Sequence, residues 1–326
     1  MKKLISLMFV TCMLLVSVCT VEAARELVHL EFGAAGIGSA TFTNMAAFGE
    51  IINTRSDYIR VNVLTTAGSV AHYHLFREGA IQLGTGAGTT DHFAWEGGNE
   101  IFPEPLRDWR TIVPFSRTFQ TVMVRTGSGL YRMSDLQGRR IAVGARAAPS
   151  SEIAIRTLSS LGITANIMHS TNAEQVELYM DGRADVYMLT SAAGNANVLN
   201  AMNTVDSRLI SLTDEEVRMI MEGDLKGLSS PALLTNEMYD FIAPGEEITV
   251  MTEVSVLNVI ADMDDQLVYD ILDLFWSNHA ELFENFRGFN TSPEDILLIS
   301  SPVHPGAARF YRERFNIEIP AERIPR

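Results

Sequence analysis

The spacing of apolar residues along the chain changes several times between the period of a strand and that of a helix. Residues 61–64 alternate like a half-buried strand, and residues 70–77 carry apolar side chains at helical spacing. Ser69 stands just before this helix and is predicted to be its N-cap. A second strand over 80–84 then leads into a glycine-rich loop over 85–91. The pattern therefore predicts a β-α-β unit.

Such a unit places a helix start and the carboxyl end of a strand at the same crevice. Free amides at a helix start attract anions, and open α/β sheets bind ligands at the carboxyl ends of their strands. The ligand-binding candidates in this unit are Ser69, Val70, His72, Thr89 and Asp91. The same residues also fit a β-α-β unit that has only a structural role and binds no ligand. The pattern by itself does not separate the two interpretations.

The succession of strand, small-residue loop and helix recurs along the rest of the chain. Further strands are predicted at residues 27–32, 109–114, 120–125, 184–189 and 255–261, and helices at 43–53, 149–161, 174–181 and 264–286. The loops that precede helices supply the remaining candidates, which are Gly36, Gly38, Ser39, Arg146, Ser150, Ser151, Asn195 and Asn197. Tyr239 is predicted to form a wall of the cleft.

Arg146 is the one cation in these predicted cleft loops. A guanidinium holds a carboxylate through two parallel hydrogen bonds, so Arg146 is a candidate for binding an acidic ligand. A solvated loop arginine is the alternative interpretation. The first loop has glycines at positions 33, 36 and 38, which is not the dinucleotide spacing Gly-x-Gly-x-x-Gly.

The N-terminus has the pattern of a cleaved secretory signal over residues 1–23. Met1-Lys2-Lys3 is basic, residues 4–18 are apolar, and Val21-Glu22-Ala23 resembles a signal-peptidase site. We therefore expect an exported, periplasmic protein that is not inserted in the membrane after cleavage. Both cysteines, Cys12 and Cys19, fall inside the signal, so no disulfide or cysteine metal site is expected. Lipidation at Cys19 is an alternative that the bulky Val18 disfavours.

Charge and motifs narrow the function classes. The formal net charge of −15 argues against nucleic acid or an anionic membrane surface as partner. No Gly-x-Ser-x-Gly elbow, His-Glu-x-x-His motif or cysteine nucleophile is present, so an enzyme is not predicted. His72 and His74 are two positions apart and would point in different directions on a helix, so neither a metal nor any other cofactor is predicted.

Several motifs taken in order resemble the TAXI-type extracytoplasmic solute receptors of TRAP transporters. They are Gly68-Ser69-Val70-Ala71, the segment 135–144 (DLQGRRIAVG), Leu267-Val268-Tyr269-Asp270 and, most specific, the segment 303–313 (VHPGAARFYRE). The resemblance covers almost the whole chain after the signal. One departure is the second-lobe helix start, where Ala147-Ala148-Pro149-Ser150 stands in place of the family's Gly-Ser-Gly-Thr.

The resemblance implies a two-lobed periplasmic binding protein of the type II-like α/β class. Each lobe is a Rossmann-like α/β sandwich, and two crossing strands join them. Lobe one is expected to comprise residues 24–125 and 255–326, and lobe two residues 126–254. The implied ligand is a small anionic solute, such as a glutamate-like amino acid or a dicarboxylate, held between lobes that close by hinge motion. The implied partner is a TRAP-type membrane permease, and the alternative is a ligand sensor that docks on a membrane signalling protein.

Overall fold

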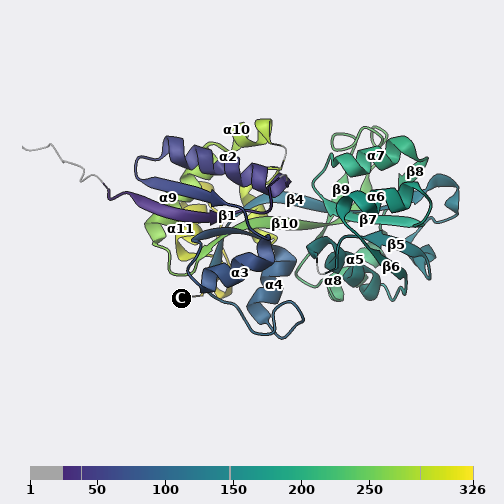
Figure 1. Cartoon of the computed structure of the whole chain (residues 1–326), viewed down its shortest axis with the longest axis horizontal. Coiled ribbons are helices and arrows are strands. Elements are labelled where there is room, and N and C mark those ends of the chain that lie inside the picture. Colours follow the sequence, from purple (N-terminus) through teal and green to yellow (C-terminus); the bar gives the residue numbers. More distant parts are fainter. Residues whose placement is uncertain (1–24, 38, 147, 287, 326) are drawn as a thin grey trace, which may run out of the picture.

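The computed structural model describes residues 25–37, 39–146, 148–286 and 288–325. Two α/β lobes lie next to each other, and the long strands β4 (Trp109–Arg125) and β10 (Ile248–Ile260) run through both (Figure 1). The lobes share a 10-stranded sheet in the order β2-β1-β3-β10-β4-β7-β5-β6, with β8 paired to β4 and β9 to β10. The predicted two-lobed α/β fold is therefore confirmed. Within the described part of the chain, no helix has the length and apolarity to cross a membrane, and the predicted signal lies outside that part.

Lobe one is built from both ends of the chain. Its elements are β1 (Val28–Gly33), α2 (Ala40–Arg55), β2 (Ile59–Leu64), α3 (Ser69–Arg77), β3 (Leu83–Ala87), α4 (Gly88–Glu96), α9 (Asp265–Ser277), α10 (His279–Asn285), η3 (Pro293–Leu297), α11 (Pro305–Phe315) and η4 (Ala321–Arg323). Strand β1 pairs in parallel with β2 and β3, and β3 is antiparallel to β10. Since β10 is also antiparallel to β4, the strands β1, β2 and β3 all run toward lobe two.

Lobe two lies between the two crossing strands in the sequence. Its elements are η1 (Thr126–Ser128), η2 (Met133–Leu136), β5 (Arg140–Val143), α5 (Pro149–Ser160), β6 (Asn166–His169), α6 (Asn172–Met180), β7 (Val186–Ser191), α7 (Ala196–Thr204), β8 (Ser207–Leu209), α8 (Asp214–Glu222) and β9 (Ser230–Leu234). Strand β7 is antiparallel to β4 and parallel to β5, which pairs with β6. These strands therefore point back toward lobe one, and the carboxyl ends of both sets face the region between the lobes.

Separate hydrophobic cores support the two lobes. One large cluster joins β1, α2, α9 and α11 to the first part of β4, as far as Phe115, and to β10 from Val254 onward. The clusters of lobe two begin at Phe119 on β4 and extend to Met251 on β10. The short stretches between these core residues, where β4 and β10 pass from one core to the other, belong to neither hydrophobic core.

Several predicted elements differ from the structure. Residues 83–87 form β3 and Gly88 begins α4, so the predicted loop over 85–91 is wrong, because extended glycines can pair in a sheet as other residues do. The N-cap of α3 is Gly68, with φ of 100°, and Ser69 is the first helical residue. The predicted strands 109–114 and 120–125 are one strand, because the crossing between lobes is itself extended. The predicted helix 264–286 divides at Asn278 into α9 and α10.

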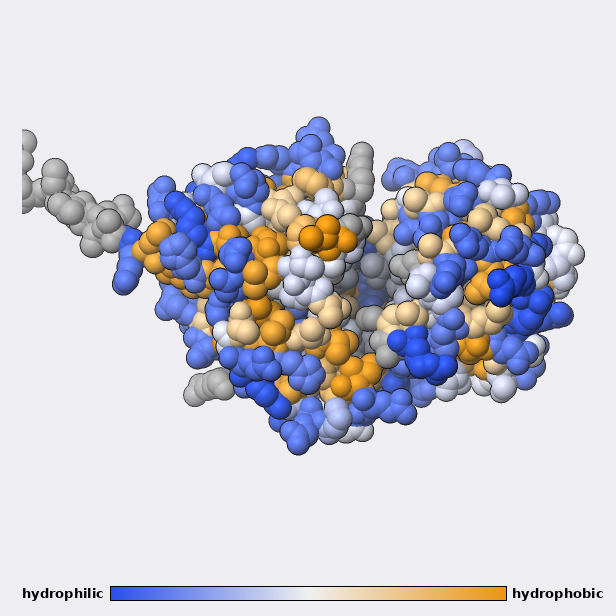
Figure 2. Space-filling model, in the orientation of Figure 1, coloured by the Kyte–Doolittle hydropathy of each residue, from blue (hydrophilic) through white to orange (hydrophobic). Residues whose placement is uncertain are grey.

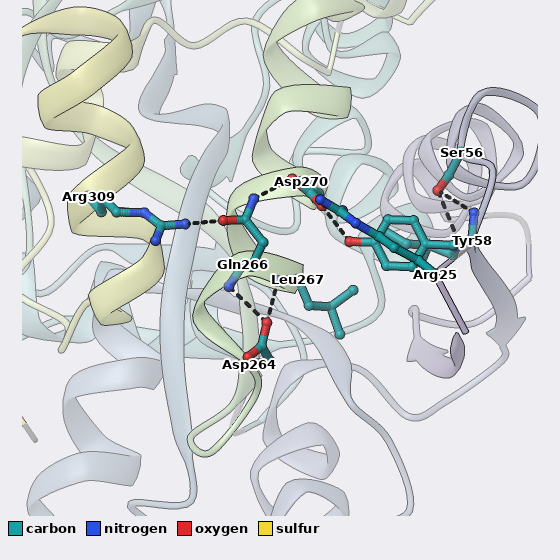
Figure 3. A network of polar contacts seen from close by, with 9 residues as sticks. Arg25, Ser56, Tyr58, Asp264, Gln266, Leu267, Asp270 and Arg309 are labelled. Carbon is teal, nitrogen blue, oxygen red and sulfur yellow. Dashed lines mark hydrogen bonds and ion pairs between the residues drawn. The ribbon is translucent and has the colours of Figure 1, made fainter. Parts of the chain in front are cut away.

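A polar network attaches the first described residues to the returning C-terminal helices (Figure 3). Asp270 on α9 accepts hydrogen bonds from Arg25 and from the Tyr58 hydroxyl, the latter at 2.5 Å. Burial, together with the hydrogen bond to Asp270, raises the pKa of Tyr58 to about 12. Gln266 bonds to Asp270 and accepts from Arg309 of α11. The network fastens α9 and α11 to the β1–β2 side of lobe one, away from the space between the lobes.

Candidate functional site

A groove of about 680 Å³ lies between the lobes, with residues of the crossing strand β4 among those that line it. Figure 2 shows the molecule hollowed between its two halves. We call this space the interlobe groove, and its lining residues are Arg117, Phe119, Ala193, Gly194, Glu237, Met238, His279, Phe283, Phe289, Asn290 and Thr291. Small-molecule sites in proteins commonly enclose roughly 300 to 1,000 Å³. The groove therefore has the size of a binding site and draws residues from both lobes.

Arg117 provides the cation of the groove. It lies on β4 where the strand passes from one core to the other, and about a third of its side chain is exposed. Its Nε and Nη2 donate to one oxygen of Asp295, at 3.1 and 2.5 Å, and the other Asp295 oxygen accepts from the Ser292 amide. The Arg117 backbone amide donates to Asn290 at 2.6 Å. Asp295 is almost fully buried, so it holds the guanidinium in one orientation.

Aromatic side chains of lobe one and of the crossing strand form the apolar wall of the groove. Phe119 and Phe289 are buried, and the Phe289 ring packs against Phe115 with centroids 6.3 Å apart. Phe283 and His279 lie on α10. Burial lowers the pKa of His279, opposed by a contact with the Phe289 backbone, so its imidazole is neutral at pH 7. The wall thus combines rings with one uncharged histidine.

Lobe two closes the other side of the groove with a turn and a buried tyrosine beneath it. Gly194 has φ of 73°, a left-handed conformation that favours glycine, and it precedes Asn195, the N-cap of α7. The Asn195 side chain accepts from the amides of Asn197 and Val198. Burial raises the pKa of Tyr239, opposed by contacts with the backbone of Asn195 and Gly194. Tyr239 therefore packs against the turn at Gly194 and Asn195 from inside lobe two.

Several residues predicted from the sequence do lie at the helix starts that face the space between the lobes. Ser39 caps α2 by accepting from the Phe42 amide at 3.1 Å, and Gly36 is exposed in the loop before it. Ser69 and Val70 begin α3, which has no side-chain cap. Arg146 is exposed in the loop before α5 and makes no ion pair with the described residues. Ser150 is half-buried in the first turn of α5, and Gly38 lies outside the described residues.

His72 was predicted to bind ligand, but the structure places it in the interior of lobe one. Its Nδ1 accepts from the Thr85 amide at 3.0 Å, and its Nε2 is 3.0 Å from the Ala34 carbonyl oxygen and must donate to it. Nε2 also lies 2.7 Å from the Thr66 hydroxyl. Burial lowers the pKa of His72, so the ring is neutral. His72 therefore ties together the ends of three strands and does not line the interlobe groove.

Asp91 was also predicted to contact ligand, and it too is fully buried. It accepts hydrogen bonds from Tyr73, from Ser301 at 2.6 Å, from Asn258 at 3.1 Å and from Thr111 at 3.3 Å. Burial raises its pKa to about 6, and these hydrogen bonds oppose the rise. Asp91 therefore joins α3, α4, the crossing strands and the C-terminal segment, and its carboxylate is already surrounded by donors.

Thr89 is buried at the start of α4, where another carboxylate occupies the helix start. Its amide donates to Glu253 of β10 at 2.7 Å. Glu253 is nearly buried, and burial together with the charge of Asp91 raises its pKa to about 7, which its hydrogen bonds with Thr89 oppose. Sequence reasoning did not single out Glu253, because a lone acidic residue in a strand carries no motif.

Of the predicted residues in lobe two, Ser151 and Tyr239 are buried. The Ser151 hydroxyl lies 3.1 Å from Nδ1 of His169, which belongs to the end of β6. Asn195 is occupied as a helix cap, as described above. Within the described part of the chain, none of the residues predicted to bind ligand is among those that line the interlobe groove, although Asn195 and Tyr239 are direct neighbours of residues that do.

The residues that sequence reasoning missed are those of the crossing strand and of the C-terminal segment. Arg117 and Phe119 stand in the middle of a strand, and Asn290 and Thr291 lie in a loop far along the chain. One local signal was available, which is an arginine in an otherwise apolar and hydroxyl-rich stretch over residues 111–124. A cation in such a strand is costly to bury without a partner, so it indicates either an ion pair or a site.

Comparison with solved structures finds the same fold in periplasmic receptors. The periplasmic sulfonate-binding protein SsuA of a putative sulfonate ABC transporter from Methylobacillus flagellatus KT is 13% identical, with a TM-score of 0.52 over 92% of this chain and 91% of that one. The probable amino-acid ABC transporter extracellular-binding protein ytmK from Bacillus subtilis is 10% identical, with a TM-score of 0.51 over 82% of this chain and 100% of that one. Both are binding proteins rather than enzymes.

At these identities the likeness shows the fold alone, which is that of two-lobed periplasmic binding proteins. No curated protein matches the chain. The sequence profile of the NMT1-like family matches residues 32–314, which is most of the chain and spans both lobes. The chain therefore belongs to the NMT1-like family.

Proposed function

We propose that this chain is a periplasmic solute receptor that captures a small carboxylate solute between its lobes and delivers it to a membrane permease. The observation that carries the proposal is the interlobe groove, with one arginine oriented in it and walls from both lobes. Guanidinium groups held in this way are well suited to bind a carboxylate. The uncapped start of α3 and the exposed Arg146, neither of which lines this groove, are further groups that can attract an anion.

The lobes are proposed to close over the solute by bending at the crossing strands. We propose that the change of lobe falls at residues 116–118 of β4 and 252–253 of β10, between the core residues of the two lobes. Hinges of this kind are a few residues that absorb changes in φ and ψ while the packed bodies move rigidly. Arg117 lies within this hinge, so ligand contact and hinge bending involve the same segment.

The TAXI-type resemblance supports a finer proposal for the partner and the solute. The segments 135–144 and 303–313, on which that resemblance depends, lie within the match to the NMT1-like family. We therefore propose a TRAP-type permease as partner, with glutamate-like amino acids and dicarboxylates as the first solutes to test. Uptake of the identified solute into vesicles should require both this protein and the permease, and uptake by the permease alone would contradict the pairing.

The receptor function is tested by binding. A ligand bound only by the folded state at 100 times its Kd adds about 2.7 kcal/mol to the free energy of unfolding, which raises Tm by several degrees. We expect such a rise with at least one member of a panel of amino acids, dicarboxylates and monocarboxylates at millimolar concentration. Mass spectrometry of solute retained through gentle purification is the independent measurement. No rise across the panel and no retained carboxylate would contradict the proposal.

A further inference from the structure

The interlobe groove has an uneven distribution of charge. Arg117 is the only lining residue with a permanent positive charge among those that the structure describes, because His279 is neutral. Asp295 accepts hydrogen bonds from Nε and Nη2 of Arg117. The third nitrogen, Nη1, makes no hydrogen bond to the described residues. Across the groove, the lobe-two residue Glu237 is exposed and lines the same space. One carboxylate group of a solute can therefore approach Arg117, whereas a second carboxylate group on the same solute would lie near the side chain of Glu237.

The remaining lining favours an apolar body rather than a second polar group. Phe119, Phe283 and Phe289 come from the crossing strand and lobe one, and Met238 with Ala193 comes from lobe two. Aromatic rings and methionine offer a large apolar contact that adapts to flat or flexible solutes. Such a wall stabilises an apolar group by roughly 25 cal/mol for each Å² removed from water. A short diacid such as succinate leaves this wall unused.

We infer that Arg117 is the carboxylate-binding residue of the receptor and that its solute is a monocarboxylic acid. The aliphatic or aromatic body of this solute packs against Phe119, Phe283 and Phe289 in the interlobe groove. This inference rests on the proposed receptor function and narrows its small carboxylate solute to a monocarboxylic acid, so glutamate-like amino acids and dicarboxylates become the solutes whose tighter binding would count against it. Nη1 of Arg117 donates to the carboxylate, Asp295 keeps the guanidinium in place, and Glu237 disfavours solutes with a second negative charge.

The first experiment compares solutes that differ in one property. Binding of phenylacetate, hexanoate, glutamate, succinate and 2-phenylethanol to the purified protein is measured by calorimetry. We expect phenylacetate and hexanoate to bind at least 10-fold more tightly than glutamate and succinate. The alcohol has the aromatic body without the acid and should not bind measurably. Tighter binding of glutamate or succinate would overturn the inference and leave the receptor function standing.

The second experiment removes the cation without leaving a buried charge unpaired. Arg117→Gln alone would strand the buried Asp295 and could unfold the protein, so the variant is Arg117→Gln with Asp295→Asn. We expect it to weaken phenylacetate binding at least 30-fold. The matched control is Arg140→Gln with Asp185→Asn, an ion pair with a nitrogen–oxygen distance of 2.6 Å at the start of β5, which should leave the affinity within 2-fold.

Two single variants make the outcome decisive. Glu237→Gln removes the acidic group that lines the groove on the lobe-two side and should improve succinate binding several-fold, by a larger factor than it changes phenylacetate binding. Arg146→Gln tests the other available cation. If Arg146→Gln abolishes binding and the Arg117 and Asp295 variant retains it, the inference is overturned and the receptor function stands. If no carboxylate binds the unmodified protein, both the inference and the proposed function are overturned.

Discussion

The two sides of the crossing strands differ in what their side chains contact. Val254 pairs with Arg117 and Glu253 with Thr118, and successive residues of a strand point to opposite faces. Arg117 and Phe119 line the interlobe groove, whereas Glu253 bonds to Thr89 of α4 and Gln120 accepts from Thr157 of α5. We call this second side the packed side. The same two strands thus present a partly exposed cation to one face and buried polar groups that bond to α4 and α5 to the other.

The difference shows that polar residues near the lobe boundary do not all serve the ligand. On the packed side, Arg156 of α5 lies over the ring of Phe93 of α4, with its Cζ 4.3 Å from the ring centroid, so the lobes already touch there. Groups that are buried and paired contribute to stability, and groups that remain exposed in a groove are available to a solute. Changes on the packed side should therefore alter stability, and changes in the interlobe groove should alter binding.

The largest effect on stability is expected at Asp91. Replacing Asp91 with alanine leaves the Tyr73 and Ser301 hydroxyls and the Asn258 amide without their acceptor in the interior. We expect the free energy of unfolding in urea to fall by roughly 3 to 5 kcal/mol. Glu96→Ala, at an exposed position of the same helix, is the control, with an expected change within about 0.5 kcal/mol. Equal effects of the two substitutions would contradict the assignment of Asp91 as a structural residue.

An intermediate effect, dependent on pH, is expected at Glu253. Its pKa is raised from the ordinary 4.5 to about 7 in the folded protein. Between these pH values the folded state retains a proton that the unfolded chain has released, so this carboxyl makes the protein less stable as pH rises. Glu253→Gln stays neutral and can still accept from Thr89. We expect the variant to be more stable than the unmodified protein by roughly 1 to 3 kcal/mol at pH 8 and about equal to it at pH 5.

Measuring urea unfolding of both proteins from pH 5 to pH 8 checks this expectation. The quantity compared is the difference in free energy of unfolding between the two proteins, because other groups also change stability with pH. One of them is the buried His72, whose pKa is lowered. A difference that stays constant across this range would show that Glu253 does not titrate there. A less stable variant at pH 8 would show that the carboxylate is favoured at the start of α4.

The smallest effect is expected for the contact between lobes on the packed side. Phe93→Leu, Arg156→Met and the double variant form a cycle in which the Arg156 interaction with Glu152, at 3.6 Å, cancels. We expect a coupling energy of about 0.5 to 1 kcal/mol in the free energy of unfolding, as for other arginine–aromatic pairs. Additive effects of the two substitutions would mean that the lobes are not held together at this point.

Local patterns were sufficient for most elements of the fold. The β-α-β unit, the start of α5 at Pro149 and the strand and helix periods in both lobes agree with the structure because they depend on neighbours in sequence. Errors arose where glycine was interpreted as a loop signal. Gly86, which was predicted in a loop, is a strand residue whose missing side chain makes room for Asp91. A Cβ at Gly86 would lie 2.2 Å from an Asp91 oxygen.

The candidate site was less predictable than the fold. The helix starts at Ser69 and Ser150 were found from capping and loop signals, which are local, and the helix predicted from residue 43 begins at Ala40, just after Ser39. Whether a polar residue faces solvent or the interior depends on what packs against it from distant segments. Ser301, which is 210 positions from Asp91, donates one of the hydrogen bonds that the buried Asp91 carboxylate accepts, and no local pattern indicates that contact.

By itself, the sequence determined that the chain alternates strands and helices in two α/β halves and that its small-residue loops precede helices. These properties follow from periodicity, caps and turns, which act over a few residues. Only the tertiary structure decided that Arg117, Asp295 and Asn290 meet at the crossing strand, while His72, Asp91 and Glu253 turn inward. The physical reason is that burial, and with it the charge and availability of each polar group, is set by contacts between segments far apart in the chain.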